Sequence, residues 1–128
     1  MRALLAWQWE GYPRYHANRA NLLLHLFVVP LFLIGTILVI VGALWASPMR
    51  AIAGIVLMSV SVFFQGRGHR LEAAPPEPFK SPANAVARLF LEQWITFPRF
   101  VLSGGWARAY STGNTSAAGK AAPPAASG

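Results

Sequence analysis

The chain has 128 residues, of which 55% are hydrophobic and only 12% are charged. A soluble domain of this length has too little interior to bury so much apolar surface, and ordinary soluble domains carry about 25% charged residues. The composition therefore excludes a typical soluble fold and favours a small membrane protein with one domain. The absence of cysteine excludes disulfides, thiolate metal ligands and a cysteine nucleophile.

The net charge is +7, from eleven Lys and Arg against four acidic residues. These basic residues flank apolar segments and form no patch with interleaved aromatic residues. This arrangement favours contact with anionic lipid headgroups over binding of nucleic acid.

The first 20 residues mix aromatic rings, such as Trp7 and Tyr12, with charged residues. Rings that carry one polar atom settle at the boundary between membrane and water, so this segment is expected to lie in the interface. Pro13 is expected to break any helix that begins at Ala3.

Two apolar segments follow and predict an integral membrane helical hairpin. No charged residue occurs from Leu22 to Ala46, a stretch that gives roughly 37 Å of helix. We place the spans at about 21–46 and 49–65, around a turn that contains Arg50. A cleaved signal peptide is the alternative for the first span, but its apolar run exceeds the roughly 7–15 residues of a signal core.

The basic residues also predict the orientation of the hairpin. Arg50 alone lies in the hairpin turn, and all other Lys and Arg lie outside the hairpin or at its opposite end. Because cytoplasmic segments carry the excess of Lys and Arg, both termini are expected to face the cytoplasm.

The remaining chain is predicted to lie on the membrane. A proline-rich connector, 73–83, leads to a helix over about 84–103 that carries charges throughout its length, which is typical of an interfacial amphipathic helix. Ser81 or Asn84 is its expected N-cap, and Pro82 is a typical first-turn residue. The fold class is thus all-α, with a single membrane domain over 1–110 and a disordered tail over 111–128.

The three histidines of the chain, His16, His25 and His69, are expected at one end of the hairpin. Asn21 and His25 share one helix face, as do Gln65, His69 and Glu72, because their spacings are three or four residues. Lipid penalises exposed polar groups, so the two faces should meet. For His16 to join them, the chain must bend near residues 17–20.

Histidines with one carboxylate suit a metal ion. The predicted ligands are His16, His25, His69 and Glu72, around non-haem Fe(II) or around zinc with water. The simpler interpretations are an amphipathic histidine at the interface, and Asn21 and Gln65 as interhelical hydrogen-bonding groups. For Glu92, the pattern favours a local helix pair with Arg88, at i and i+4.

Two motifs resemble the signatures of the 2-hydroxy fatty acid dioxygenase family. They are Tyr15-His16-x4-Asn21-x3-His25-x4-Pro30-Leu31 and Gln65-x2-Gly68-His69-x2-Glu72-x3-Pro76. This membrane family includes the fungal enzyme of phytosphingosine breakdown to odd-numbered fatty acids. The resemblance covers about residues 12–103, and the occurrence of both motifs in order, at the ends of apolar spans, makes it fairly specific.

The resemblance implies Fe(II)-dependent α-oxidation, in which a 2-hydroxy fatty acid and molecular oxygen give the acid one carbon shorter. It places His16, His25 and His69 on the motif histidines, and Asn21, Gln65 and Glu72 on its polar partners. On this hypothesis, His16, His25, His69 and Glu72 are catalytic metal ligands, Arg67 or Arg70 attracts the substrate carboxylate, and Asn21 and Gln65 orient the site.

Two other classes of function fit the residues. The first is a non-enzymatic membrane hairpin that forms a homo-oligomer through small residues such as Gly35, Gly42 and Gly54. The second is a zinc-dependent lipid hydrolase that uses the same ligands. The identity of the metal and a dependence on oxygen separate these classes from the dioxygenase.

Overall fold

A computed structural model describes residues 1–113 of the chain, and this part is helical without any strand. Residues 114–128, which make up most of the predicted disordered tail, lie outside the described residues. The all-α prediction is confirmed. The elements in chain order are α1 (Arg2–Tyr15), α2 (Arg19–Leu44), α3 (Pro48–His69), α4 (Pro82–Leu91), the π-helical turn η1 (Glu92–Thr96), α5 (Phe97–Leu102) and α6 (Gly105–Thr112).

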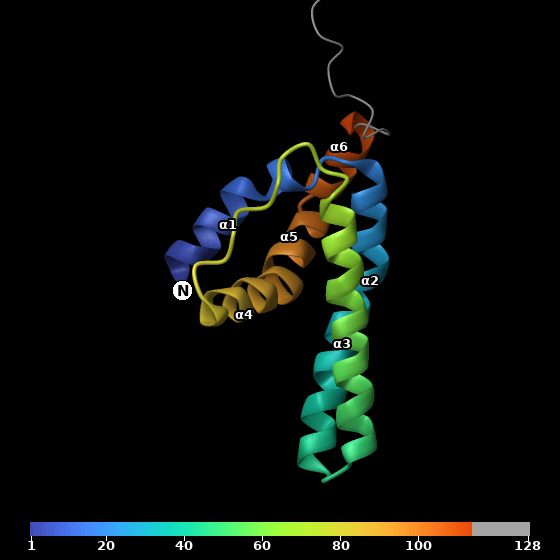
Figure 1. Cartoon of the computed structure of the whole chain (residues 1–128). Coiled ribbons are helices and arrows are strands. Elements are labelled where there is room, and N and C mark those ends of the chain that lie inside the picture. Colours follow the sequence, from blue (N-terminus) through green and yellow to red (C-terminus); the bar gives the residue numbers. More distant parts are fainter. Residues whose placement is uncertain (114–128) are drawn as a thin grey trace, which may run out of the picture.

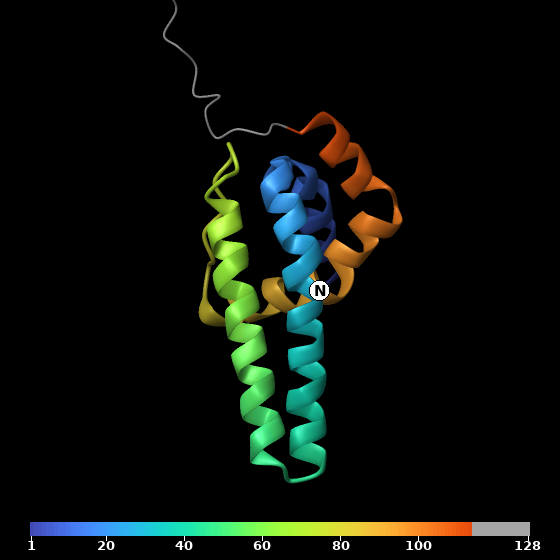
Figure 2. The same ribbon diagram turned by 90° about the vertical axis from the view of Figure 1, so that its right-hand side faces the viewer.

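The predicted hairpin is formed by α2 and α3, which pack side by side along their whole length (Figures 1 and 2). Both helices are long and apolar enough to cross a membrane. The turn between them passes through Ala46, which has a positive φ of 48°. The second helix extends about one turn further than the predicted 49–65 and ends at His69, so this histidine still belongs to the hairpin.

Three glycines bring the backbones of the two hairpin helices into close contact. A Cβ atom added to Gly54 would lie 2.5 Å from the carbonyl oxygen of Gly35, and one added to Gly42 would lie 2.6 Å from the amide nitrogen of Ala51. These are the glycines that the sequence suggested for an oligomer interface. In the structure they pack α2 against α3 within one chain.

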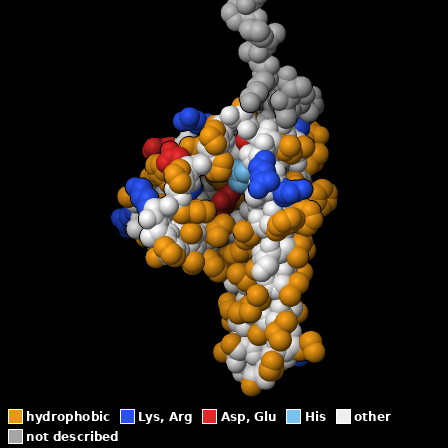
Figure 3. Space-filling model, viewed as in Figure 1, with side chains coloured by type: hydrophobic (Ala, Val, Ile, Leu, Met, Phe, Trp, Pro, Cys, Tyr) orange, Lys and Arg blue, Asp and Glu red, His pale blue; other side chains and the backbone are white. Residues whose placement is uncertain are grey.

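The half of the hairpin next to the turn exposes many large apolar side chains, and Figure 3 shows them on the face in view. Such a surface is unfavourable in water and matches hydrocarbon, which is the physical case for insertion in a membrane. The most exposed of these side chains include Ile34, Ile37, Ile40, Leu44, Met49, Ile52, Ile55 and Val56.

The other helices gather around the half of the hairpin that is remote from the turn (Figures 1 and 2). There η1 and α6 pack against α2, α1 packs against η1 and α4, and these elements enclose a cluster of buried apolar side chains. This cluster consists of Tyr12, Leu22, Val29, Phe97 and Phe100.

The first helix differs from the sequence prediction. Pro13 does not break it, because α1 runs from Arg2 to Tyr15 with the proline inside. A proline removes the hydrogen bond from its own nitrogen and crowds the carbonyl four residues earlier. Only two residues of α1 follow Pro13, so the local cost of this disruption falls on the end of the helix.

The predicted helix over 84–103 is also interrupted. It begins earlier, at Pro82, because Ser81 is the N-cap and its Oγ accepts a hydrogen bond of 3.1 Å from the amide of Asn84. A π-helical turn then separates α4 from α5. After a turn at Ser103 and Gly104, α6 runs from Gly105 to Thr112, so residues 111 and 112 of the predicted tail are helical.

Candidate metal centre

His16, His25, His69 and Glu92 come together in the half of the molecule that is remote from the hairpin turn. Each offers one ligand atom, and the four atoms lie within 4.8 Å of one another. The ring centroids are 4.7 Å apart for His16 and His25, 4.8 Å for His16 and His69, and 5.0 Å for His25 and His69. The predicted convergence of the three histidines is thus present in the structure, and the group is of a kind that holds a metal ion.

A sharp bend between α1 and α2 brings His16 next to His25. The bend falls at residues 16–18, which overlaps the start of the predicted range, 17–20. Asn18 begins the new helix as its N-cap, with Oδ1 accepting hydrogen bonds of 2.9 Å from the amide of Ala20 and 3.2 Å from that of Asn21. An asparagine at this position is among the strongest helix starts.

Backbone carbonyls orient two of the histidine rings. Nδ1 of His16 lies 3.1 Å from the carbonyl oxygen of Tyr12, and Nδ1 of His25 lies 3.0 Å from that of Asn21. A carbonyl only accepts, so each Nδ1 carries the proton and each Nε2 keeps a lone pair. This is the usual arrangement of a histidine whose other nitrogen binds a metal.

The free ring nitrogens have no hydrogen-bond partner among the described residues. Nε2 of His16, Nε2 of His25 and Nδ1 of His69 are all buried and make no hydrogen bond to any residue from 1 to 113. Buried polar atoms are almost always satisfied, so three orphaned nitrogens at one point call for an external partner. Imidazole nitrogen with one carboxylate fits iron, zinc or copper.

Glu92 supplies the carboxylate. Its Oε1 accepts a hydrogen bond of 3.2 Å from the hydroxyl of Tyr12 and lies 3.5 Å from Nε2 of His16. Burial raises the pKa of this carboxyl, whereas its hydrogen bond with His16 and the charges that the three imidazoles carry when protonated lower the pKa, to about 2 in sum. Glu92 thus presents its carboxyl group to three imidazoles.

The π-helical turn that begins at Glu92 is fixed by buried amides. Gln93 and Gln65 donate to each other through their side-chain amides, at 2.8 and 2.9 Å, which ties the turn to α3. Thr96 donates to Oε1 of Gln8 at 3.2 Å, which ties it to α1. π-helical turns occur frequently at functional sites, and this one carries the acidic member of the group.

The carboxylate of Glu72, which sequence reasoning placed among the ligands, lies elsewhere. It accepts hydrogen bonds from the backbone amides of Ala17 and Asn18, at 3.1–3.2 Å, and from Nδ2 of Asn21 at 2.6 Å. These hydrogen bonds join the bend before α2 to the residues that follow α3. Glu72 therefore holds the loop that presents His16, and the carboxylate beside the histidines is that of Glu92.

Gly68, a residue of the second motif, makes room for the hydrogen bond between Asn21 and Glu72. A Cβ atom at Gly68 would collide with Oδ1 of Asn21. Without a side chain at Gly68, Asn21 fits between α2 and α3 and reaches Glu72. The amide of Asn21 therefore serves Glu72, while its backbone carbonyl orients His25.

The other predicted site residues lie outside the histidine group. Gln65 donates to Ser61 at 2.9 Å and to Gln93, and does not orient a histidine. Arg67 and Arg70 are exposed, and the guanidinium of Arg67 lies 5.7 Å from the ring centroid of Phe63. Neither arginine lines the cavity beside the histidines, whereas Gln65 does.

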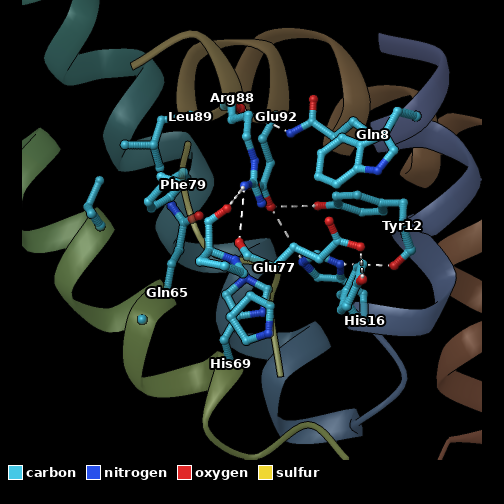
Figure 4. A pocket seen from close by; sticks show the side chains of 16 residues that line it. Gln8, Tyr12, His16, Gln65, His69, Glu77, Phe79, Arg88, Leu89 and Glu92 are labelled. Atoms are coloured by element: carbon cyan, nitrogen blue, oxygen red, sulfur yellow. Dashed lines mark hydrogen bonds and ion pairs between the residues drawn. The ribbon is translucent and has the colours of Figure 1, made fainter. Parts of the chain in front are cut away.

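A cavity of about 340 Å³ opens directly onto the histidine group (Figure 4). His16, His69 and Glu92 form its inner end, and its walls come from α1, α3, α4 and the connector. Figure 3 shows histidine and acidic side chains in the hollow between the hairpin and the covering helices. The apolar and aromatic wall residues are Trp7, Tyr12, Tyr15, Val62, Pro76, Pro78, Phe79 and Leu89.

Comparisons of this chain with protein-family models, with curated proteins and with solved structures find no match. The site itself combines four potential ligands from four segments of the chain with an apolar cavity beside them.

Sequence reasoning missed Glu92 because its spacing from Arg88 matches an ordinary surface pair. One signal pointed to it: Glu92 lies within an apolar stretch, between Leu91 and Trp94, where a carboxylate requires a specific partner.

Proposed function

We propose that this protein is an Fe(II)-dependent membrane dioxygenase that converts a 2-hydroxy fatty acid to the acid one carbon shorter. The proposal rests on three buried histidine nitrogens that make no hydrogen bond within residues 1–113, beside one carboxylate and an apolar cavity. The resemblance of the two sequence motifs to the 2-hydroxy fatty acid dioxygenase family supplies the reaction. One molecule of oxygen is consumed per acid, and the carboxyl carbon leaves as CO₂ with one molecule of water.

His16, His25, His69 and Glu92 would hold the iron, which would supply the redox chemistry with oxygen. Three histidines and one carboxylate leave positions open on an octahedral metal, as iron oxygenases require. The carbonyls of Tyr12 and Asn21 keep the ligand nitrogens of His16 and His25 unprotonated, and the hydroxyl of Tyr12 orients the carboxylate of Glu92. The cavity would take the first part of the acyl chain and exclude water.

Turnover of 2-hydroxypalmitate by the purified, Fe(II)-loaded protein tests this proposal. We expect pentadecanoic acid and CO₂ in equal amounts under air, and neither product without oxygen. His69→Ala is expected to abolish both products. Arg67→Ala keeps them, because Arg67 lies outside the cavity. Full activity of His69→Ala, or product formation without oxygen, would contradict the proposal.

The zinc hydrolase remains the rival with the same ligands, and the same assay separates the two. A hydrolase would act on a lipid ester with Zn(II), without oxygen, and would leave 2-hydroxypalmitate unchanged.

We also propose that the histidine group and both ends of the described chain face the cytoplasm. The support is the distribution of charge, since Arg50 is the only basic residue at the hairpin turn. Because the chain has no cysteine, single cysteines report topology cleanly. In intact expressing cells, a membrane-impermeant maleimide should label Met49→Cys at the turn, and should label Ser111→Cys only after permeabilisation. The reverse pattern would show the opposite orientation.

A further inference from the structure

One of the residues that line the cavity, Arg88, carries a positive charge and is not a member of the group formed by the three histidines and Glu92. Arg88 extends from α4 into the cavity wall, on the same side as Glu92 (Figure 4). Its guanidinium carbon lies 4.8 Å from the ring centroid of Trp7 and 4.6 Å from that of Phe79. Two aromatic faces therefore hold the guanidinium in place.

Only one of the guanidinium nitrogens has protein partners. Nη1 donates to the backbone carbonyl oxygens of Glu77 and Pro78, at 3.0 and 3.2 Å. Nε and Nη2 make no hydrogen bond to any residue in the described part of the chain. An arginine has five N–H donors in a rigid fork, so three of them remain available.

No acidic side chain neutralises Arg88. Within residues 1–113, the only ion pair closer than 4 Å is that between His16 and Glu92. The second acid of the cavity, Glu77, accepts a hydrogen bond of 3.3 Å from the hydroxyl of Tyr15. Arg88 is thus a half-buried, oriented cation without a counter-ion, in a cavity with largely apolar walls.

We infer that Arg88 is the anchor for the carboxylate of a long-chain fatty acid, which it binds through the free edge of its guanidinium. A planar fork matches a carboxylate in a two-point contact, and the apolar walls match the acyl chain. The inference rests on the proposed function for the 2-hydroxy acid as substrate. It replaces Arg67 and Arg70 in the role that sequence reasoning gave them, since both lie outside the cavity.

Binding to the Zn(II)-loaded full-length protein in phosphatidylcholine nanodiscs tests this inference without any turnover. The probes are radiolabelled palmitate and hexadecanol, which differ only in the head group. We expect the wild type to bind palmitate at least about tenfold more tightly than hexadecanol, and Arg88→Gln to reduce this preference to less than about threefold. Arg88→Lys, which keeps the charge without the fork, should lie between them.

Arg99→Gln is the matched control. Arg99 also lies over a tryptophan ring, 4.0 Å from the centroid of Trp9, but does not line the cavity. It should keep the wild-type preference. No preference for palmitate in the wild type would overturn the inference, even if Arg88→Gln failed to fold. Displacement of palmitate by dodecyl phosphate at a lower concentration than by laurate would also overturn it, since the anchor would then be for phosphate.

The binding test and the turnover test can fail independently of each other. If palmitate is preferred in an Arg88-dependent way but 2-hydroxypalmitate is not turned over, the protein has a fatty acid site and the dioxygenase proposal is wrong. If 2-hydroxypalmitate is turned over but Arg88→Gln keeps the wild-type preference for palmitate, only the role of Arg88 is wrong.

Discussion

Glu92→Gln is expected to weaken Fe(II) binding by about 100-fold or more, whereas Glu72→Gln should keep it within about tenfold of the wild type. Loss of a group that merely supports a metal ligand already costs roughly 10–100-fold in affinity, and Glu92 is one of the four potential ligands. Glutamine removes its negative charge and presents a weaker ligand oxygen. The affinity is measured by competition with a chromophoric Fe(II) chelator under anaerobic conditions.

Glu72→Gln should instead lower stability. The Glu72 carboxylate accepts hydrogen bonds from two backbone amides and from Asn21, and a neutral amide weakens these contacts by about 1–3 kcal/mol in total. Thermal unfolding of the detergent-solubilised protein reports this loss. The assignment of the two glutamates would be wrong if Glu72→Gln lost the metal and Glu92→Gln retained it.

Gly54→Ala is expected to destabilise the hairpin by about 1–3 kcal/mol, the usual cost of forcing extra atoms into a packed interior. The added methyl group would lie 2.5 Å from the carbonyl oxygen of Gly35. This contact is with backbone, so α2 and α3 must separate to relieve it. Because His25 and His69 lie on these two helices, metal affinity should fall together with stability.

Gly66→Ala on the same helix is the control for helix propensity. A Cβ atom at Gly66 meets no atom within 4 Å, so the substitution should be neutral or stabilising by up to about 1 kcal/mol. Thermal unfolding in one detergent compares the two variants. Equal stability of Gly54→Ala and Gly66→Ala would show that α2 and α3 do not pack through Gly54.

Hydropathy and helical spacing were sufficient to predict the hairpin and the convergence of the three histidines. A long uncharged segment has few alternatives to a helix that crosses lipid, and the antiparallel turn brings His25 and His69 to one depth. The bend before α2 could also be predicted, because His16 and His25 lie nine residues apart and would otherwise point in different directions.

The fourth potential ligand, Glu92, and the proposed substrate anchor, Arg88, could not be predicted in the same way. Glu92 and Arg88 lie on a helix that follows an irregular connector, so their position depends on long-range contacts between α4, α1 and α3. The mutual hydrogen bonds of Gln65 and Gln93 join residues far apart in the sequence. Glu72 matched the spacing of a ligand, but no sequence rule shows that its carboxylate closes a backbone bend.

Metal analysis of protein purified anaerobically with iron present is the sharpest test of the metal centre. We expect about one iron per chain in the wild type, and loss of that iron from the His25→Ala/His69→Ala double variant. A folded wild-type protein that binds no metal would contradict the metal centre, and would favour a structural membrane hairpin. Zinc bound in preference to iron would contradict the dioxygenase and would favour the hydrolase.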